Sequence, residues 1–303
     1  MLDPLSQVIS LLRPRTVDSK AISGRGPWAV RYAPFGQPSF CVVLEGGCVL
    51  AAEGHAPVVL AAGDFVFLPT TPGFTLSSFE PATPVLVEPD TTSPQPEEVR
   101  HGLQDGQPDV RLLGGYFLFE SPDTALLAAL LPKVVHVRGI DRLVHLVRWV
   151  DEEARADHAG RDLLLVKLVE AMLIEALRAS PDTAAEPGLL RGLADARLAA
   201  SIRHMHADPA KAWTMASLAA TASLSRSAYF ERFVRAMRIP PMEYLAAWRM
   251  ALAKDMLLRE DIGLDRVAER VGYSTASAFS TAFRRHVGQS PGRYAKKAGS
   301  ALV

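Results

Sequence analysis

The chain has 303 residues, equal numbers of basic and acidic residues (33 each) and two cysteines. This length fits about two domains, and the longest apolar segment, residues 163–177, contains three charged residues, which argues against a membrane span. The first residues lack the basic and apolar pattern of a signal peptide, and so few cysteines fit a reducing compartment. We therefore expect a cytoplasmic protein.

Short strands are predicted over residues 28–80, where apolar runs alternate with Gly and Pro turns. The run FCVVLEGGCVLAAE (40–53) predicts a hairpin that turns at Glu45-Gly46-Gly47, and residues 56–79 predict two further strands. Residues 81–109 contain six prolines and predict a long surface loop, after which RLLGGYFLFE (111–120) returns to a strand. This pattern is typical of a small β-barrel or sandwich.

The pattern then becomes helical. The run SPDTALLAALLP (121–132) begins with a helix-cap signal, and apolar residues recur with helical spacing over 141–156 and 162–179. The apolar stripes of these two helices are Leu143, Leu146, Val147 and Val150, and Leu165, Leu168, Val169, Met172 and Leu173. The stripes either close the back of the barrel or form a homodimer seam. Residues 180–188, with two prolines and a glycine, predict a linker.

Charge is unevenly distributed along the chain. Residues 189–303 hold 18 Lys and Arg against 9 Asp and Glu, whereas the rest of the chain holds 15 against 24. A basic segment next to an acidic remainder is typical of a nucleic-acid-binding module on a separate domain. The alternative is a chance segregation of solvated charges.

Residues 217–244 and 266–294 resemble one another. Leu218 aligns with Val267, and after one inserted residue Tyr229 aligns with Phe279. Two copies are too few for a solenoid. Each copy instead predicts a helix-turn-helix, in which a second helix, capped by Ser225 or Ser274, buries an aromatic pair spaced four residues apart.

The opposite face of each second helix is predicted to contact DNA. Small and hydroxyl side chains let a helix enter the major groove, and basic residues at its far end would meet phosphates. Gly288 supplies a left-handed C-cap, and Ser290-Pro291 ends the run. The alternative is an ordinary bundle with a solvated polar face. The candidate DNA-contacting residues are Arg226, Ser227, Phe230, Glu231, Thr275, Ala276, Ser277, Ser280, Thr281, Arg284 and Arg285.

The C-terminal hundred residues resemble the AraC/XylS family of bacterial transcription regulators, through LAATASLSRSAYFERF, WRMALAKDML and VAERVGYSTASAFSTAFRRHVGQSPGRY. The resemblance implies two helix-turn-helix units bridged by a helix around residues 243–258, which enter adjacent segments of the major groove. Arg238 stands where the family usually has Gly. Phe230 and Glu231 occupy groove-facing positions that often carry polar or basic groups.

Residues 3–140 resemble the cupin-like sensor of one AraC branch, through DPLSQVISLL, GPWAVRY, VVLEGG, LAAGDFVFLP and LLAALLPKVVHVRG. The resemblance implies a barrel whose mouth holds a ligand. Phe40 and Phe74 stand at family-like positions and are large enough to fill that pocket. Glu45, Glu53 and His55 lack metal-ligand spacing, so we expect no metal, no cofactor and no enzymatic activity.

Cys41 and Cys48 are candidates for a redox pair. A two-residue turn would place the two thiols on one face as diagonal neighbours, ~7–8 Å apart, at or beyond the ~7 Å limit for a disulfide. A three-residue turn would place them on opposite faces. The favoured alternative is two small buried side chains.

Together these patterns predict an α+β protein of two domains. Residues 1–140 form a cupin-like sensor, 141–180 a helical pair for dimerisation, 181–194 a linker, and 195–303 a tandem helix-turn-helix domain. The predicted function is a sequence-specific regulator that binds double-stranded DNA as a homodimer, responds to a small-molecule effector, contacts RNA polymerase and does not bind membranes. The alternatives are a metal-free cupin enzyme with an accessory DNA-binding domain, and a DNA-bending or partner-recruiting protein without a ligand.

Overall fold

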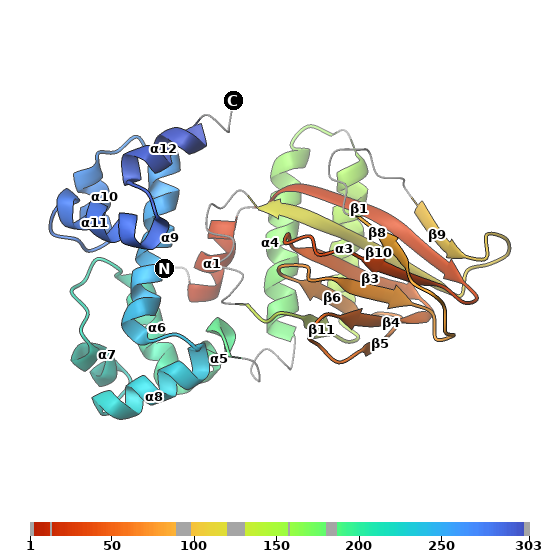
Figure 1. Cartoon of the computed structure of the whole chain (residues 1–303), viewed down its shortest axis with the longest axis horizontal. Helices are drawn as coiled ribbons and strands as arrows, with labels where there is room; N and C mark the ends of the chain where they lie inside the picture. Colours follow the sequence, from red (N-terminus) through yellow and green to blue (C-terminus); the bar gives the residue numbers. More distant parts are fainter. Residues whose placement is uncertain are drawn as a thin grey trace. The chain divides into compact units, whose positions relative to one another are not determined.

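The computed structural model describes residues 3–12, 14–88, 98–119, 131–156, 158–179 and 187–299 (Figure 1). The chain divides into two compact units. The β-rich unit contains residues 13–120 and 131–183, and the helical unit contains residues 1–12, 121–130 and 184–303. The predicted α+β fold is confirmed. The predicted helix at 121–132 and the first part of the predicted linker 181–194 lie largely outside the described residues, whereas the last part of that linker forms helix α5 (Leu189–Ala194).

The β-rich unit contains two sheets, as Figure 1 shows. Within the described residues, the six-stranded sheet has the order β11 (Val135–Val137), β6 (Phe65–Leu68), β3 (Ser39–Glu45), β10 (Val110–Phe119), β1 (Pro14–Arg25) and β9 (Glu98–Gly102). The five-stranded sheet has the order β5 (Val58–Ala61), β4 (Gly47–Ala52), β7 (Phe74–Ser77), β2 (Ala29–Tyr32) and β8 (Val85–Val87).

The predicted hairpin over residues 40–53 is wrong. β3 pairs with β6 and β10, whereas β4 pairs with β5 and β7 in the other sheet. The Glu45-Gly46-Gly47 turn therefore carries the chain between sheets. A Cβ at Gly46 would lie 1.9 Å from the carbonyl oxygen of Asp109, and its φ of 70° is in the left-handed region, so this crossing needs glycine.

The loop predicted over residues 81–109 contains two short strands. β8 adds to β2, and β9 adds to β1, both in parallel. Both strands lie at sheet edges, where proline is tolerated. The prolines near them therefore make this segment resemble a loop in the sequence.

The core of the β-rich unit lies between the sheets, where Val43, Val66 and Leu112 pack with Leu50 and Leu76. Helices α3 (Asp141–Arg155) and α4 (Arg161–Ala179) pack against each other and against β1. The side chains of the two predicted stripes are buried, except Leu146, which is half-buried, and Ala176 and Leu177 extend the buried face of α4. The stripes are therefore covered within the unit and are not an open homodimer seam.

The helical unit includes α1 (Pro4–Leu12), which comes from the N-terminal end of the sequence, whereas the other helices of this unit come from the C-terminal part. Its other helices are α5 (Leu189–Ala194), α6 (Ala196–Ala207), α7 (Met215–Thr221), α8 (Arg226–Met237), α9 (Pro241–Arg259), α10 (Leu264–Arg270), α11 (Ala276–Val287) and α12 (Pro291–Gly299). The bridging helix expected around 243–258 is α9. Within the described part of the chain, no helix is long and apolar enough to cross a membrane.

Candidate nucleic-acid interface

Two helix-turn-helix units, α7–α8 and α10–α11, stand on either side of α9 in the sequence. Ser225 caps α8, accepting a hydrogen bond from the Ala228 amide (3.3 Å). The equivalent cap of α11 is Thr275, whose hydroxyl accepts from the Ala278 amide (3.1 Å). The predicted cap at Ser274 is wrong, because the residue gained in the second copy precedes the cap.

The predicted aromatic pairs are buried and fix how each second helix is turned. The ring centroids of Tyr229 and Phe233 lie 5.7 Å apart, and those of Phe279 and Phe283 lie 5.5 Å apart. Tyr244 and Tyr294 each add a third ring to one pair, in edge-to-face contact. With the aromatic face of each helix buried, the opposite face is held outward.

The turns of both units use left-handed backbone. Ser223 (φ 53°) and Gly272 (φ 77°) occupy matching positions in the two turns. The C-caps match as well, with Arg238 (φ 56°) after α8 and Gly288 (φ 82°) after α11. An arginine in this conformation costs about 1–2 kcal/mol of backbone strain. The C-cap of the first copy is therefore strained, whereas the glycine C-cap of the second copy is not.

The structure places nearly all candidate DNA-contacting residues at the surface. Two are half-buried, Ala276 and Ser280. The exposed candidates are Arg226, Ser227, Phe230, Glu231, Thr275, Ser277, Thr281, Arg284 and Arg285. Thr281 donates a hydrogen bond to the backbone oxygen of Ser277 (3.0 Å), so its hydroxyl oxygen remains available as an acceptor and its methyl group for apolar contact.

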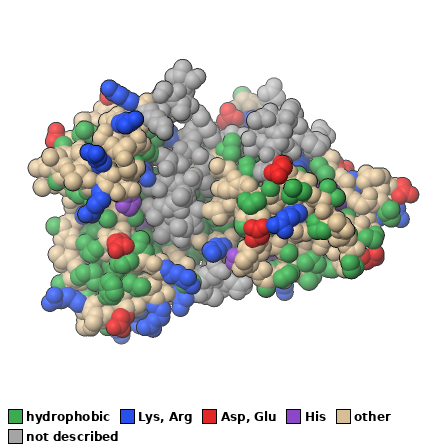
Figure 2. All heavy atoms as spheres, in the orientation of Figure 1, with side chains coloured by type: hydrophobic (Ala, Val, Ile, Leu, Met, Phe, Trp, Pro, Cys, Tyr) green, Lys and Arg blue, Asp and Glu red, His purple; other side chains and the backbone are tan. Residues whose placement is uncertain are grey.

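Positive charge gathers at the end of α11. Arg284 and Arg285 are exposed and form no ion pair with the residues that the structure describes. Figure 2 shows further Lys and Arg side chains at the surface of the helical unit. Not all of them are free for DNA, because Arg232 is paired with Asp195, which caps α6. The two arginines of α11 are thus well suited to contact phosphates.

The β-rich unit holds a cavity of about 170 Å³. Phe40 and Phe74 line this cavity and leave it open, so they do not fill the pocket. Cys41 also lines it, with Lys20 and Tyr32. Among the described residues, no group of three or more His, Cys, Asp or Glu side chains gathers as a metal site would require.

The two cysteines are protonated at neutral pH. Burial raises the pKa of the Cys48 thiol to about 12 and that of Cys41 further still, with the nearby Cys48 as a second cause for Cys41. Both thiols face the core between the sheets, on strands of different sheets. Because the thiolate is the reactive form, this arrangement favours two small buried side chains over a redox pair.

Sequence reasoning missed a buried histidine that joins α1 to the DNA-binding helices. His206 on α6 contacts Gln7 on α1 and Tyr244 on α9, and its ring stacks on Trp248 at 4.0 Å. Desolvation by burial lowers the pKa of His206 to about 3. The sequence signal for this contact is the amphipathic run PLSQVISLL. Its spacing predicts that one face of the helix is buried, but not which helix covers that face.

Comparison with known proteins places both units in families. A cupin model matches residues 3–181, and a helix-turn-helix domain model matches residues 218–297. Over 302 residues the chain is 36% identical to a protein of Streptomyces lividans described as an AraC-like transcription regulator, covering 97% of this chain and 98% of the relative. It is 28% identical over 305 residues to the RCS-specific HTH-type transcriptional activator RclR of Escherichia coli strain K12, covering 98% of each.

Among solved structures, the DNA-binding domain of AdpA in complex with a target DNA is similar to this chain. It is 27% identical, with a TM-score of 0.33, and the match covers 34% of this chain and 93% of that one.

A cupin sandwich and a tandem helix-turn-helix in one chain define a DNA-binding transcription regulator. The chain belongs to the AraC family of these regulators. Its relatives are transcription regulators and not enzymes, as the sequence predicts.

Proposed function

We propose that this regulator binds specific operator DNA through α8 and α11, and that a small molecule in the β-rich unit controls this binding. The observation that carries the proposal is the cavity of about 170 Å³ between two sheets, in the same chain as two helices whose outer faces are exposed. A signal that binds one unit and changes DNA affinity in the other amounts to a coupling free energy of typically ~1–3 kcal/mol.

The direct test is fluorescence anisotropy with labelled DNA from upstream of the gene, in competition with unrelated DNA of equal length. We expect saturable binding to the upstream DNA that survives the competitor. Equal competition by both DNAs would contradict sequence-specific recognition. Repeating the titration with extracts of small molecules tests control: a change in affinity supports a sensor, and an unchanged affinity across the screen favours the ligand-free alternative.

We propose a homodimer formed through the outer face of the α3–α4 pair. Three apolar side chains of this pair are well exposed: Trp149 (59%), Leu163 (68%) and Leu164 (47%). Exposed apolar side chains of this size are typical of contact surfaces. A dimer would present two helix-turn-helix pairs to paired half-sites. Contact with RNA polymerase and action in the cytoplasm stay predictions.

Redox control through Cys41 and Cys48 also stays a prediction. In its favour is the RCS-specific name of the Escherichia coli relative; against it are the raised thiol pKa values. A Cys41→Ser, Cys48→Ser double variant decides the matter in the same DNA-binding assay. If oxidant changes the affinity of the wild type and not of the variant, the cysteines are sensors; equal behaviour removes them from the mechanism.

A further inference from the structure

Strand register places Lys20 and Cys41 on either side of a glycine in the cavity wall. Lys20 on β1 lies opposite Gly114 on β10, and Gly114 lies opposite Cys41 on β3. Directly opposed residues project from the same face of a sheet. The row Lys20–Gly114–Cys41 therefore has a side chain at each end and none in the middle, which leaves a hollow in the wall.

The cavity as a whole has room for about one aromatic ring. The cavity measures about 170 Å³, and an apolar cavity of about 150 Å³ binds benzene. A Cβ at Gly114 would already lie 3.3 Å from Cδ1 of Ile22 and 3.6 Å from Cβ of Cys41. Any larger side chain at this position would take up space that a ligand needs.

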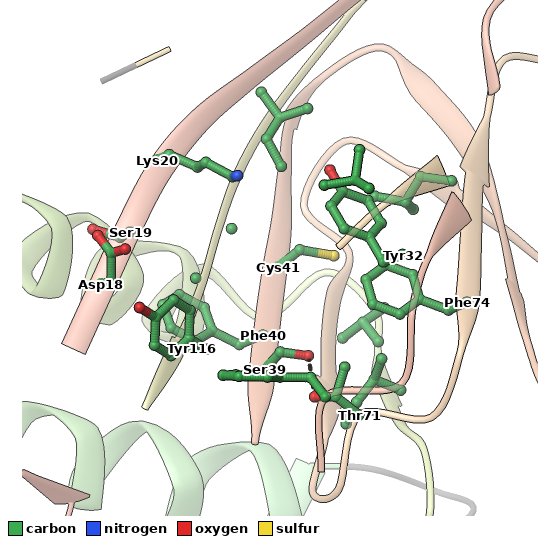
Figure 3. Close-up of a pocket in the computed structure, with 18 of the residues that line it drawn as sticks. Asp18, Ser19, Lys20, Tyr32, Ser39, Phe40, Cys41, Thr71, Phe74 and Tyr116 are labelled. Carbon is green, nitrogen blue, oxygen red and sulfur yellow. Dashed lines mark hydrogen bonds between the residues drawn. The ribbon is translucent and has the colours of Figure 1, made fainter. Parts of the chain in front are cut away.

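The wall across from the hollow is aromatic and aliphatic. Tyr32 and Phe74 stack with their ring centroids 4.8 Å apart and their planes at 19°, and Leu50 and Leu76 line the cavity beside them. Figure 3 shows the Cys41 side chain directed toward this pair of rings. Such a wall favours a ligand with a flat apolar body, because aromatic rings gain from offset stacking as well as from burial.

Charged groups lie on β1, on the side of the cavity away from Tyr32 and Phe74, and the hydroxyl groups of Ser39, Thr71 and Tyr116 line the cavity as well (Figure 3). Asp18 and Lys20 both line it, two residues apart on one face of the strand, and Figure 3 shows Lys20 reaching into the same space. Burial lowers the pKa of Lys20, and the Asp18 carboxylate partly offsets this. Glu88 lines the cavity too but is exposed. One acid and one base at the same end nearly balance, so a charged ligand would add an uncompensated charge to a partly desolvated site.

A hydroxyl group suits this end of the cavity better than a charge. It can donate a hydrogen bond to the Asp18 carboxylate and accept one from the Lys20 ammonium group. We infer that the cavity takes an uncharged molecule with a single aromatic ring and one hydroxyl-type head, whose ring occupies the hollow at Gly114. This inference rests on the proposed function, since it names the ligand class of the proposed sensor.

The experiment is isothermal titration of the full chain at pH 7 with three probes of matched size: benzyl alcohol, benzoate and benzylammonium. We expect benzyl alcohol to bind at least about tenfold more tightly than either ion, which corresponds to about 1.4 kcal/mol. Tighter binding of benzoate or of benzylammonium would overturn the uncharged class, and binding of none of the three would overturn the single-ring class.

Three variants locate the probe. Gly114→Val should abolish binding of benzyl alcohol by filling the hollow. If this variant fails to fold, Cys41→Leu replaces it, because it enlarges a side chain that already points into the cavity. Val59→Leu, on an exposed position of edge strand β5, is the matched control and should bind as the wild type does. Unchanged binding by a folded Gly114→Val or Cys41→Leu chain would place the probe elsewhere and overturn the inference.

Charge variants test the balance between Asp18 and Lys20. Lys20→Met should shift the preference toward benzylammonium, and Asp18→Asn should shift it toward benzoate. If neither variant changes the order of the three probes, the two side chains do not select the ligand. DNA anisotropy with benzyl alcohol separates this inference from the proposed function: probe binding without any effect on DNA affinity leaves the ligand class standing while the sensor function fails.

Discussion

The Nδ1 atom of His206 lies 2.8 Å from the Oε1 atom of Gln7, 199 positions earlier in the chain. The other ring nitrogen, Nε2, lies 2.6 Å from the hydroxyl oxygen of Tyr244. A neutral ring satisfies both contacts, because Nδ1–H donates to the Gln7 amide oxygen and Nε2 accepts from the Tyr244 hydroxyl. Protonation would make Nε2 a donor, so that the Tyr244 hydroxyl would have to rotate and accept, and would place a charge in a site that desolvation disfavours.

This arrangement makes stability depend on pH. The pKa of His206 is lowered to about 3 in the folded chain, so between about 6.5 and 3 the unfolded chain binds one more proton at this residue. The stability contribution is fully present above pH 6.5 and is lost as the pH falls, by about 1.4 kcal/mol per pH unit. Urea unfolding at pH 7.5, 6.0 and 5.0 measures this slope.

The matched variants are His206→Gln, which cannot titrate, and His158→Gln, which changes an exposed histidine. We expect the acid loss of stability to shrink in His206→Gln and to persist in His158→Gln. The same slope in all three proteins would mean that His206 takes up its proton as readily in the folded chain as in the unfolded one, which contradicts its burial.

Arg238 gives a second prediction about stability. Its left-handed conformation (φ 56°) is the one that Gly288 adopts in the second copy. Arg238→Gly should raise the free energy of unfolding by about 0.5–1 kcal/mol, since relief of strain outweighs the extra freedom of the unfolded chain. Gly288→Ala should have the opposite sign. Thermal denaturation of both variants checks the pair, and a lower melting temperature for Arg238→Gly contradicts it.

The sequence predicts the DNA-binding helices well because their signals are local. The spacing of Phe279 and Phe283 fixes which face of α11 is buried, and that in turn fixes the outer face. The hairpin error has a different origin. The alternating apolar residues around Cys41 and Cys48 fit a hairpin of two paired strands. They fit two strands in opposite sheets, facing each other across a core, just as well. Only the long-range pairing of β3 with β10 decides between the two arrangements.

The same reasoning explains why the packing partner of α1 and the residues that line the cavity were not predicted, although a pocket in the barrel was. The apolar face of α1 predicts burial, but the choice of α6 as partner depends on His206, which in the sequence is one histidine among eight. Likewise, Gly114 in GGY reads as a break in a strand. Its importance appears only once Lys20 and Cys41 are known to lie opposite it in neighbouring strands.

Arg284 and Arg285 should contribute affinity without sequence preference. Replacing both with Ala should weaken binding to operator and unrelated DNA by a similar factor, and should reduce the slope of log affinity against log salt by up to about two. Arg266→Ala is the control, because Arg266 is exposed on α10 and paired with Glu269. Anisotropy titrations at several salt concentrations measure the slopes, and an unchanged slope in the double variant removes these arginines from the interface.

Ser277 and Thr281 should instead contribute sequence preference. Each is exposed on the outer face of α11, where side chains of this size reach base edges or thymine methyl groups. Ser277→Ala and Thr281→Ala should each change the ranking of single-base operator variants, with effects of about 1–3 kcal/mol at the contacted base pair. A uniform loss across all operators would assign both residues to backbone contact.

The exposed face of the α3–α4 pair should hold the dimer together. Trp149→Glu combined with Leu163→Glu puts charge on this face without touching the buried stripes, so we expect a folded monomer in sedimentation experiments. Val59→Glu is the matched control, since Val59 is similarly exposed (57%) on edge strand β5. A double variant that sediments as a dimer would place the seam elsewhere.

Ser19 is positioned to couple the cavity to the helical pair. It lines the cavity with its β1 neighbours Asp18 and Lys20, but its hydroxyl is engaged outside the cavity, donating to Oδ1 of Asp151 on α3 (2.9 Å). Arg155 contacts the same carboxylate oxygen at 2.8 Å without involving β1. If a ligand shifts β1, Ser19 carries that shift to α3. Ser19→Ala should therefore keep probe binding in calorimetry and lose most of the ligand effect on DNA affinity, whereas Arg155→Ala should keep both. A full ligand response in Ser19→Ala would show that the signal leaves the cavity through other contacts.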